Sequence, residues 1–200
     1  MSDSFRPSRR QIVASSATLG LAAIASPALA LSTGSSVVDA AKAGLARVGD
    51  RILHQDVVGV ADFSPASSQS RLHLVDIAAG RIDSVLVAHG RGSDPAHTGW
   101  LSRFSNAPGS DCTSEGAYLT GAEYIGEHGR SMRLIGLDPT NCNAEPRAVV
   151  VHSAWYVGPE MIRARGMLGR SDGCFAVGET DLPGVLGRLG PGRLLVAAKL

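Results

Sequence analysis

Two side chains of this sequence are suited to covalent chemistry, Cys174 and His152. Cys174 lies in the glycine-rich segment 169–177, directly after a glycine that permits close approach of the backbone. His152 ends the apolar run 148–152, where a polar ring is unfavourable unless it has a partner. A free thiol has a pKa of about 8.5, so only roughly 3% is thiolate at pH 7 and catalysis needs a neighbouring base or cation. The two residues together indicate a cysteine nucleophile served by a histidine base.

The cysteine count also singles out Cys174. The chain has three cysteines, so one thiol is left over if the other two pair. Cys112 and Cys142 lie in polar, turn-like surroundings, and a disulfide between them is an open question that spacing alone does not settle. Cys174 could also be a small buried hydrophobic residue, but Arg170 and Asp172 beside it argue against full burial.

Hydrophobic periodicity indicates the elements that must position this pair. Apolar residues recur at steps of three and four from Val37 to Ile52, which predicts an amphipathic helix. Short apolar runs bounded by turn residues predict strands over 57–63, 71–77, 81–89, 117–125, 131–137, 148–156 and 194–198. The polar stretch 90–112 predicts a long loop, a kind that is usually functional, and 181–189 predicts a short helix. The pattern favours a mainly β sandwich or barrel with an N-terminal amphipathic helix.

Composition and the N-terminal residues bound the organisation of the chain. The 200 residues, with 24 glycines and a formal net charge of +1, suit one globular domain and offer no electrostatic footprint for nucleic acid. Arg9 and Arg10 precede the apolar run 12–24, which is too short to span a bilayer, and a small-residue site follows at 28–30. This pattern predicts a secretory leader of the twin-arginine type and a product exported to the periplasm if the cell has an outer membrane.

A resemblance to a known family rests on an ordered set of segments. His152-Ser153, followed later by Gly169-Arg170-Ser171-Asp172-Gly173-Cys174, resembles the signature of the L,D-transpeptidase catalytic domain, which is His, then Ser or Thr, any residue, Gly and Cys. Upstream segments that look like the murein subgroup of this family are 61–64, 88–93, 104–106 and 133–137. The likeness covers about residues 50–199. Together with the N-terminal pattern and the helical periodicity, it predicts a leader at 1–30, a helical segment at 31–56 and a catalytic domain at 57–200.

The resemblance implies a role for each matching residue. Cys174 matches the family's nucleophile, His152 its base, Ser153 the residue whose main-chain carbonyl orients the imidazole, and Gly173 an amide that receives the oxyanion. The implied reaction needs no cofactor: Cys174 forms a thioester with a tetrapeptide stem of peptidoglycan and releases D-alanine. The acyl group then passes to an amine, giving a 3-3 cross-link, or to water. The acceptor and the oligomeric state stay open.

Four further residues are candidates for contact with the stem peptide, whose carboxylates suit arginine side chains. They are Arg170, Ser171, Arg91 and His89. The arginines and the serine could equally form an ordinary solvated surface, and His89 could be a hydrogen-bonded structural residue.

The sequence departs from the family at two positions. Many members carry His or Trp where this chain has Asp172, and Arg where it has Ala176. A carboxylate facing the sulfur would oppose thiolate formation, so we expect Asp172 to point away, toward Arg170 or Arg163. These changes bear on substrate preference rather than on the nucleophile and base.

Two alternatives belong to other classes. An exported zinc hydrolase would gather ligands from the residues His89, His97, His128, His152, Asp94 and Asp111, although the sequence has no tight ligand pair. A catalytically silent peptidoglycan-binding module would share the sandwich but would not need a reactive thiol. A serine nucleophile elbow at 169–173 is excluded, because no histidine follows His152 in the chain.

Overall fold

The computed structural model describes the backbone of residues 27–200 and the surroundings of side chains from residue 34 onward. In this part of the chain nine strands form one hydrogen-bonded sheet in the order β3-β2-β1-β9-β5-β6-β7-β8-β4. The strands are β1 (Val57–Asp62), β2 (Leu72–Asp76), β3 (Ile82–Val85), β4 (Val87–Ala88), β5 (Gly116–Gly126), β6 (Gly129–Gly136), β7 (Val150–Ser153), β8 (Phe175–Val177) and β9 (Leu194–Ala198). The prediction of a mainly β protein is confirmed.

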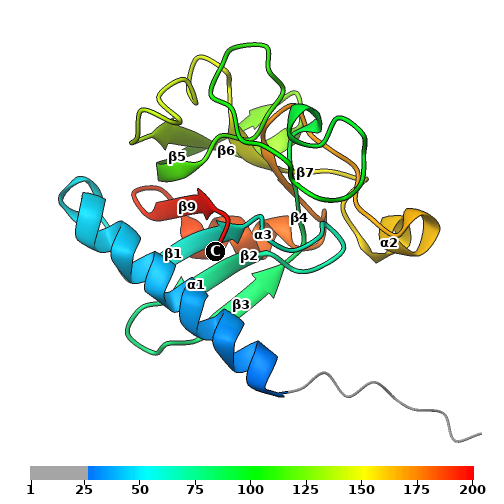
Figure 1. Ribbon diagram of the computed structural model, residues 1–200. Coiled ribbons are helices and arrows are strands. Elements are labelled where there is room, and N and C mark those ends of the chain that lie inside the picture. The colour runs from blue at the N-terminus through cyan, green and yellow to red at the C-terminus, as the bar shows by residue number, and fades with distance from the viewer. Residues whose placement is uncertain (1–26) are drawn as a thin grey trace, which may run out of the picture.

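The sheet folds over on itself, so that β5, β6 and β7 face β9, β1 and β2 across a common core (Figure 1). β5 belongs to both halves, because it pairs with β9 near its start and with β6 along its length. Its register with β6 shifts between Thr120 and Glu123, and an irregularity of this kind bends a strand and increases its twist. The result is the two-layered sandwich that the sequence predicts.

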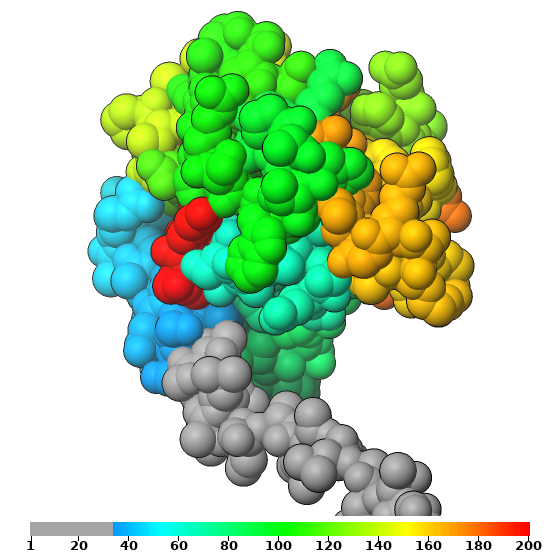
Figure 2. Space-filling view, turned by 45° about the vertical axis from the view of Figure 1, so that its right-hand side comes forward, coloured from blue at the N-terminus to red at the C-terminus, as the bar shows by residue number. Residues whose placement is uncertain are grey.

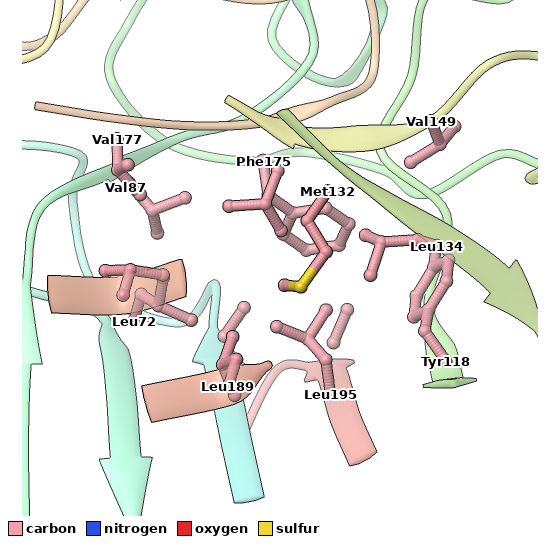
Figure 3. Packing of buried hydrophobic residues seen from close by; sticks show 14 of the residues in the cluster. Leu72, Val87, Tyr118, Met132, Leu134, Val149, Phe175, Val177, Leu189 and Leu195 are labelled. Atoms are coloured by element: carbon pink, nitrogen blue, oxygen red, sulfur yellow. The ribbon is translucent and has the colours of Figure 1, made fainter. Parts of the chain in front are cut away.

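Apolar side chains from both halves fill the space between the layers (Figure 3). Met132 and Phe175 come from one side, and Leu195 comes from the other. Helix α3 (Leu182–Leu189), predicted over 181–189, adds its own buried leucines to this core. Because Phe175 directly follows Cys174 and is fully buried, the core fixes the strand on which the nucleophile candidate depends.

Helix α1 (Pro27–Val48) covers the outer face of β1, β2 and β9 (Figure 1). Val37 and Ala41 are buried there against Val58 and Leu194 in a second apolar cluster. α1 ends at Val48, four residues before the predicted end at Ile52, and a short 3-10 helix, η1 (Gly49–Arg51), follows it. None of the helices in residues 27–200 combines the length and the hydropathy that crossing a bilayer requires.

The structure differs from the expected elements in four places. The strand predicted over 81–89 is divided into β3 and β4, and the one predicted over 148–156 is limited to β7. Two elements are additional, β8 and helix α2 (Pro159–Arg165). β8 has only three residues, all buried, so it shows no alternation that sequence inspection could detect. The loop predicted over 90–112 is confirmed and contains only the 3-10 turn η2 (Arg91–Ser93).

That loop packs beside the segment that leads to Cys174. Figure 2 shows the green surface of residues near 100–110 next to the orange surface of residues near 165–175. His97 Nε2 lies 3.0 Å from the carbonyl oxygen of Leu168, and the amide of Arg91 donates to the carbonyl of Ser171 at 2.7 Å. Residues 1–26 of the predicted leader (1–30) lie outside the described part of the chain, so the leader stays a prediction.

Candidate active site

The pairing of β7 with β8 brings the segments of the candidate nucleophile and base together. The two strands are parallel, and His152 pairs with Ala176, two residues after Cys174. Cys174 itself lies directly before β8, so the pairing brings the turn with the thiol alongside the strand that carries the imidazole.

His152 is held as a neutral base. Its ring is buried, and its Nδ1 lies 2.8 Å from the main-chain carbonyl oxygen of Ser153. A carbonyl oxygen only accepts hydrogen bonds, so Nδ1 carries the proton and the lone pair of Nε2 is free to take another. Burial lowers the pKa of His152 and a like charge on His128 lowers it further, while the Ser153 carbonyl acts in the opposite direction. The imidazole is therefore neutral near pH 7.

Cys174 is a protonated thiol at rest. The residue is only 9% exposed, and its Sγ lies 3.7 Å from the carbonyl oxygen of Ala148. Burial raises the pKa of the thiol, the amide of Val150 and the charge of Arg147 oppose this, and the charge of Asp172 adds to it. The expectation that its charged neighbours keep Cys174 from burial is wrong, because Asp172 alone turns outward, with its side chain 69% exposed.

The turn before β8 has a shape that only glycine permits. Gly173 has a φ of +115°, and a Cβ added there would lie 2.7 Å from the carbonyl oxygen of Cys112. The Oγ of Ser171 donates to the carbonyl of Cys174 at 2.7 Å and accepts the Gly173 amide at 3.2 Å. Ser171 is thus buried and stabilises the turn through these two hydrogen bonds, which corrects its prediction as a surface contact for substrate. The oxyanion role predicted for Gly173 requires its amide to leave Ser171.

The two arginines predicted to bind substrate carboxylates already have partners in the protein. Arg170 Nη1 donates to the main-chain carbonyls of Asp94 and Pro95 and so ties the segment before Cys174 to the 90–112 loop. Arg91 binds the carboxylates of Asp111, at 2.9 Å, and Asp172, at 3.3 Å. The expectation that Asp172 pairs with Arg170 or Arg163 is therefore wrong, because it pairs with Arg91.

His89 lies beneath the surface rather than in contact with solvent. It is 1% exposed, and its Nδ1 is 2.8 Å from a guanidinium nitrogen of Arg71. Its Nε2 faces the carboxylate of Asp94 at 3.4 Å. Burial, followed by the charge of Arg71, lowers the pKa of His89 to about 4. His89 is placed to support the loop that starts at Gly90, which corrects its prediction as a substrate contact.

The remaining cysteines and histidines are dispersed. Cys112 and Cys142 are both free thiols, the first buried and the second exposed, so the disulfide considered from the sequence is not formed. In the part of the chain that the structure describes, no three His, Cys, Asp or Glu side chains gather as metal ligands. Of the histidines considered for a zinc site, His89 contacts Arg71 and His97 contacts the Leu168 carbonyl, whereas His128 and His152 stack on each other.

Three residues near the pair were not assigned to the cysteine site from the sequence, where His128 was considered only as a zinc ligand. His128, in the turn between β5 and β6, stacks on His152 with ring centroids 4.3 Å apart and planes at 22°. Arg147 lies beside Gly173, where its Nη2 would be 2.8 Å from an added Cβ. Tyr156 is half-buried, and burial, followed by the charges of Cys174 and Asp172, raises its pKa to about 12. No local pattern in the sequence relates Arg147 or Tyr156 to the cysteine.

Comparisons with known proteins show the family of the chain. The family model of the L,D-transpeptidase catalytic domain matches residues 31–197. Similar solved structures include an L,D-transpeptidase from Mycobacterium smegmatis, with 15% identity, a TM-score of 0.43, and coverage of 72% of this chain and 58% of that one. An L,D-transpeptidase from Mycobacterium tuberculosis H37Rv has 16% identity, a TM-score of 0.45 and the same coverage.

A third similar structure is L,D-transpeptidase 3 from Mycobacterium tuberculosis in complex with a faropenem-derived adduct, with 15% identity, a TM-score of 0.44, and coverage of 72% of this chain and 60% of that one. The chain thus spans less than two thirds of the length of these structures. No curated protein matches it. Because the family model extends over nearly the whole described chain and includes both β7 and the Cys174 turn, the protein belongs to the L,D-transpeptidase catalytic domain family.

Proposed function

We propose that this protein is a peptidoglycan L,D-transpeptidase in which Cys174 is the nucleophile and His152 the base. The observation that carries the proposal is the parallel pairing of β7 with β8, which runs the segment directly after Cys174 alongside the strand of His152 although the two residues are 22 positions apart in the chain. Membership of the family supports the reaction class. The hydrogen bond from His152 Nδ1 to the Ser153 carbonyl supports the role of the imidazole, because it leaves Nε2 free to accept the thiol proton.

The first half of the reaction forms a thioester. His152 Nε2 takes the proton of the Cys174 thiol as the sulfur attacks the carbonyl carbon after the third residue of a tetrapeptide stem. The C–N bond to the terminal D-alanine then breaks, and the imidazolium returns its proton to the departing amine. Both pKa shifts favour the neutral forms, the thiol upward and the imidazole downward, so the pair is neutral at rest and the thiolate forms by proton transfer to His152.

The second half transfers the acyl group. An amine of a neighbouring stem attacks the thioester, His152 removes its proton, and the sulfur leaves to be reprotonated, which gives a 3-3 cross-link. Water in place of the amine gives a shortened stem and an L,D-carboxypeptidase activity. In both cases a main-chain amide is needed for the oxyanion, and one such donor typically lowers the barrier by about 3–4 kcal/mol. The Gly173 amide can serve once it has released Ser171 Oγ.

The substrate places the protein outside the cytoplasm. Peptidoglycan stems are reached by an exported enzyme, and the arginine pair, apolar run and small-residue site in residues 1–30 supply the leader for such export. We therefore include export to the periplasm in the proposal. Replacing Arg9 and Arg10 by Lys tests it, since the fractionated cell should then retain the protein in the cytoplasm.

Muropeptide analysis tests the reaction directly. Purified protein is incubated with wall fragments that carry tetrapeptide stems, and the products are separated and identified by mass spectrometry. Loss of D-alanine together with 3-3 dimers is expected for the wild type and for Cys142→Ala, which removes an exposed thiol. Neither product is expected for Cys174→Ala.

Other results have defined meanings. Shortened stems without dimers identify a carboxypeptidase. Wall fragments that bind but stay unchanged with every variant identify a binding module and refute the proposal. Activity in Cys174→Ala that disappears with a chelator identifies a metal hydrolase and refutes it as well.

A further inference from the structure

Arg147 occupies an unusual position for a surface arginine. It precedes β7 by three residues and is half-buried, and it has no catalytic role in the function proposed above. Its guanidinium donates to the carbonyl of Ser105 at 3.1 Å, to the Oγ of Ser114 at 2.6 Å and to the carbonyl of Cys112. All three acceptors lie at the end of the long loop or just beyond it. The fork of donors therefore holds this part of the chain in place.

These partners are neutral, so the charge of Arg147 is not compensated by them. Among residues 34–200 no Asp or Glu forms an ion pair with it. Yet its Nη2 would lie 2.8 Å from a Cβ added to Gly173, the residue that precedes the nucleophile. A fixed, half-buried cation without a carboxylate thus stands next to the Cys174 turn, where a positive charge stabilises an anion on sulfur.

The backbone beside Arg147 strengthens this placement. Ala148 has a φ of +52°, a left-handed conformation that costs an L-residue about 1–2 kcal/mol. The carbonyl oxygen of this strained residue faces the Cys174 thiol at 3.7 Å. Strained residues of this kind persist where the surrounding structure holds them, often at active sites. Residues 147 and 148 therefore present both a cation and a hydrogen-bond acceptor to the nucleophile turn.

We propose that Arg147 is a positioning residue of the cysteine site: it favours the thiolate form of Cys174 through its charge and holds the segment around Ser105, Cys112 and Ser114 against the nucleophile turn. This inference rests on the proposed function, because a transpeptidase uses that thiolate as its nucleophile. Arg147 itself touches neither the sulfur nor the reacting carbonyl in the proposed reaction.

The other charges that face Cys174 leave Arg147 as the cation with the clearest effect. From its own segment Asp172 opposes the thiolate, but this carboxylate is exposed and paired with Arg91. From β7 the imidazole of His152 is neutral near pH 7. Arg91 is also held by Asp111 and is fully exposed to solvent, where its charge is screened. The charge of Arg147 lowers the pKa of the thiol against the dominant effect of burial.

Alkylation of Cys174 as a function of pH tests the inference without any substrate. The full chain is treated with iodoacetamide, and the rate is followed at the Cys174 peptide by mass spectrometry, which separates it from Cys112 and Cys142. Arg147→Gln keeps hydrogen-bond donors but loses the charge, whereas Arg147→Lys keeps the charge but loses the fork. Arg165→Gln, at an exposed position of α2, changes the net charge by the same amount and is the matched control.

The charge predicts distinct results for these variants. Arg147→Gln should alkylate about twofold more slowly at pH 7, with its titration moved to higher pH. Arg147→Lys and Arg165→Gln should alkylate at the rate of the wild type and keep its titration. Equal rates for the wild type and a folded Arg147→Gln protein would overturn the inference, because the arginine would then only hold the loop.

Two further outcomes are also decisive. If Arg147→Gln does not fold, as judged by circular dichroism, the Lys variant decides: a retained titration supports the role of the charge and a lost one refutes it. Failure of the proposed function can be distinguished from failure of this inference, because alkylation of Cys174 needs no peptidoglycan substrate. A normal Arg147 effect without cross-linked products would leave this inference standing and remove the proposed function.

Discussion

The ring of His128 lies over the ring of His152, with centroids 4.3 Å apart and planes inclined by 22°. His128 comes from the exposed turn between β5 and β6, whereas His152 is 3% exposed on β7. One imidazole thus covers the other from the solvent side. Together with the hydrogen bond from Nδ1 to Ser153, the stack fixes the plane of the proposed base.

Replacing His128 by Ala is expected to change the pH dependence of transpeptidation. The substitution exposes His152 and removes a like charge, and both burial and this charge lower the pKa of His152. Its pKa should therefore rise, and the acidic limb of the kcat profile should move to higher pH, because a larger fraction of the base is protonated at a given pH. The release of D-alanine measured from pH 5 to 9 gives this profile. His54→Ala, at an exposed position remote from β7, is the control, and an unmoved limb in His128→Ala would contradict the prediction.

Replacing Asp172 by Asn should increase the reactivity of Cys174. The carboxylate raises the pKa of the thiol, so its loss should raise the alkylation rate near pH 7 by about twofold, with the modest size set by its exposure to solvent. The sign is opposite to that expected for Arg147→Gln. Asp50→Asn provides a control with the same change in net charge. A slower rate in Asp172→Asn would show that its pairing with Arg91 matters more than its charge.

Replacing Ser171 by Ala should loosen the nucleophile turn. The Gly173 amide loses its acceptor and the Cys174 carbonyl loses its donor at a site that is only 4% exposed. Leaving such groups unpaired costs about 1–3 kcal/mol, so the free energy of unfolding in urea should fall by about that amount. We also expect a tenfold or larger loss in kcat with little change in KM. Ser70→Ala, at an exposed position, should change neither quantity.

His89 should make the stability of the protein sensitive to mild acid. Its folded pKa is about 4, whereas an unfolded histidine has a pKa of about 6.5. Between these values the unfolded state binds the extra proton, so the free energy of unfolding decreases as pH falls through this window. The loss approaches about 3 kcal/mol at pH 4 and is absent above pH 7.

Urea unfolding at pH 7.5 and pH 4.5 measures this loss. The difference between the two pH values should be smaller in His89→Gln than in the wild type. Part of it should persist, because burial also lowers the pKa of His73 and of His152. His54→Gln, which alters an exposed histidine, should leave the difference unchanged. An identical difference in His89→Gln would show that His89 does not remain neutral in the folded protein.

Local signals in the sequence predicted most of the fold. The helix that became α1, the strands other than β8 and the short helix α3 all show an apolar period or turn residues at their ends. β8 was missed because its three residues are buried on both faces and therefore do not alternate. The division of the strand predicted over 81–89 was missed because Leu86, between β3 and β4, is as apolar as its neighbours.

The sequence by itself determined which residues could do chemistry: a leftover cysteine after a glycine and a histidine in an apolar strand. Only the tertiary structure decided their arrangement, because parallel pairing of β7 with β8 joins residues that no local pattern relates. The same holds for Arg147 and His128, whose neighbours come from other strands and loops. The tertiary structure also buries His89 and Ser171. The partners of a buried polar group depend on the packing of distant segments and not on the residues beside it.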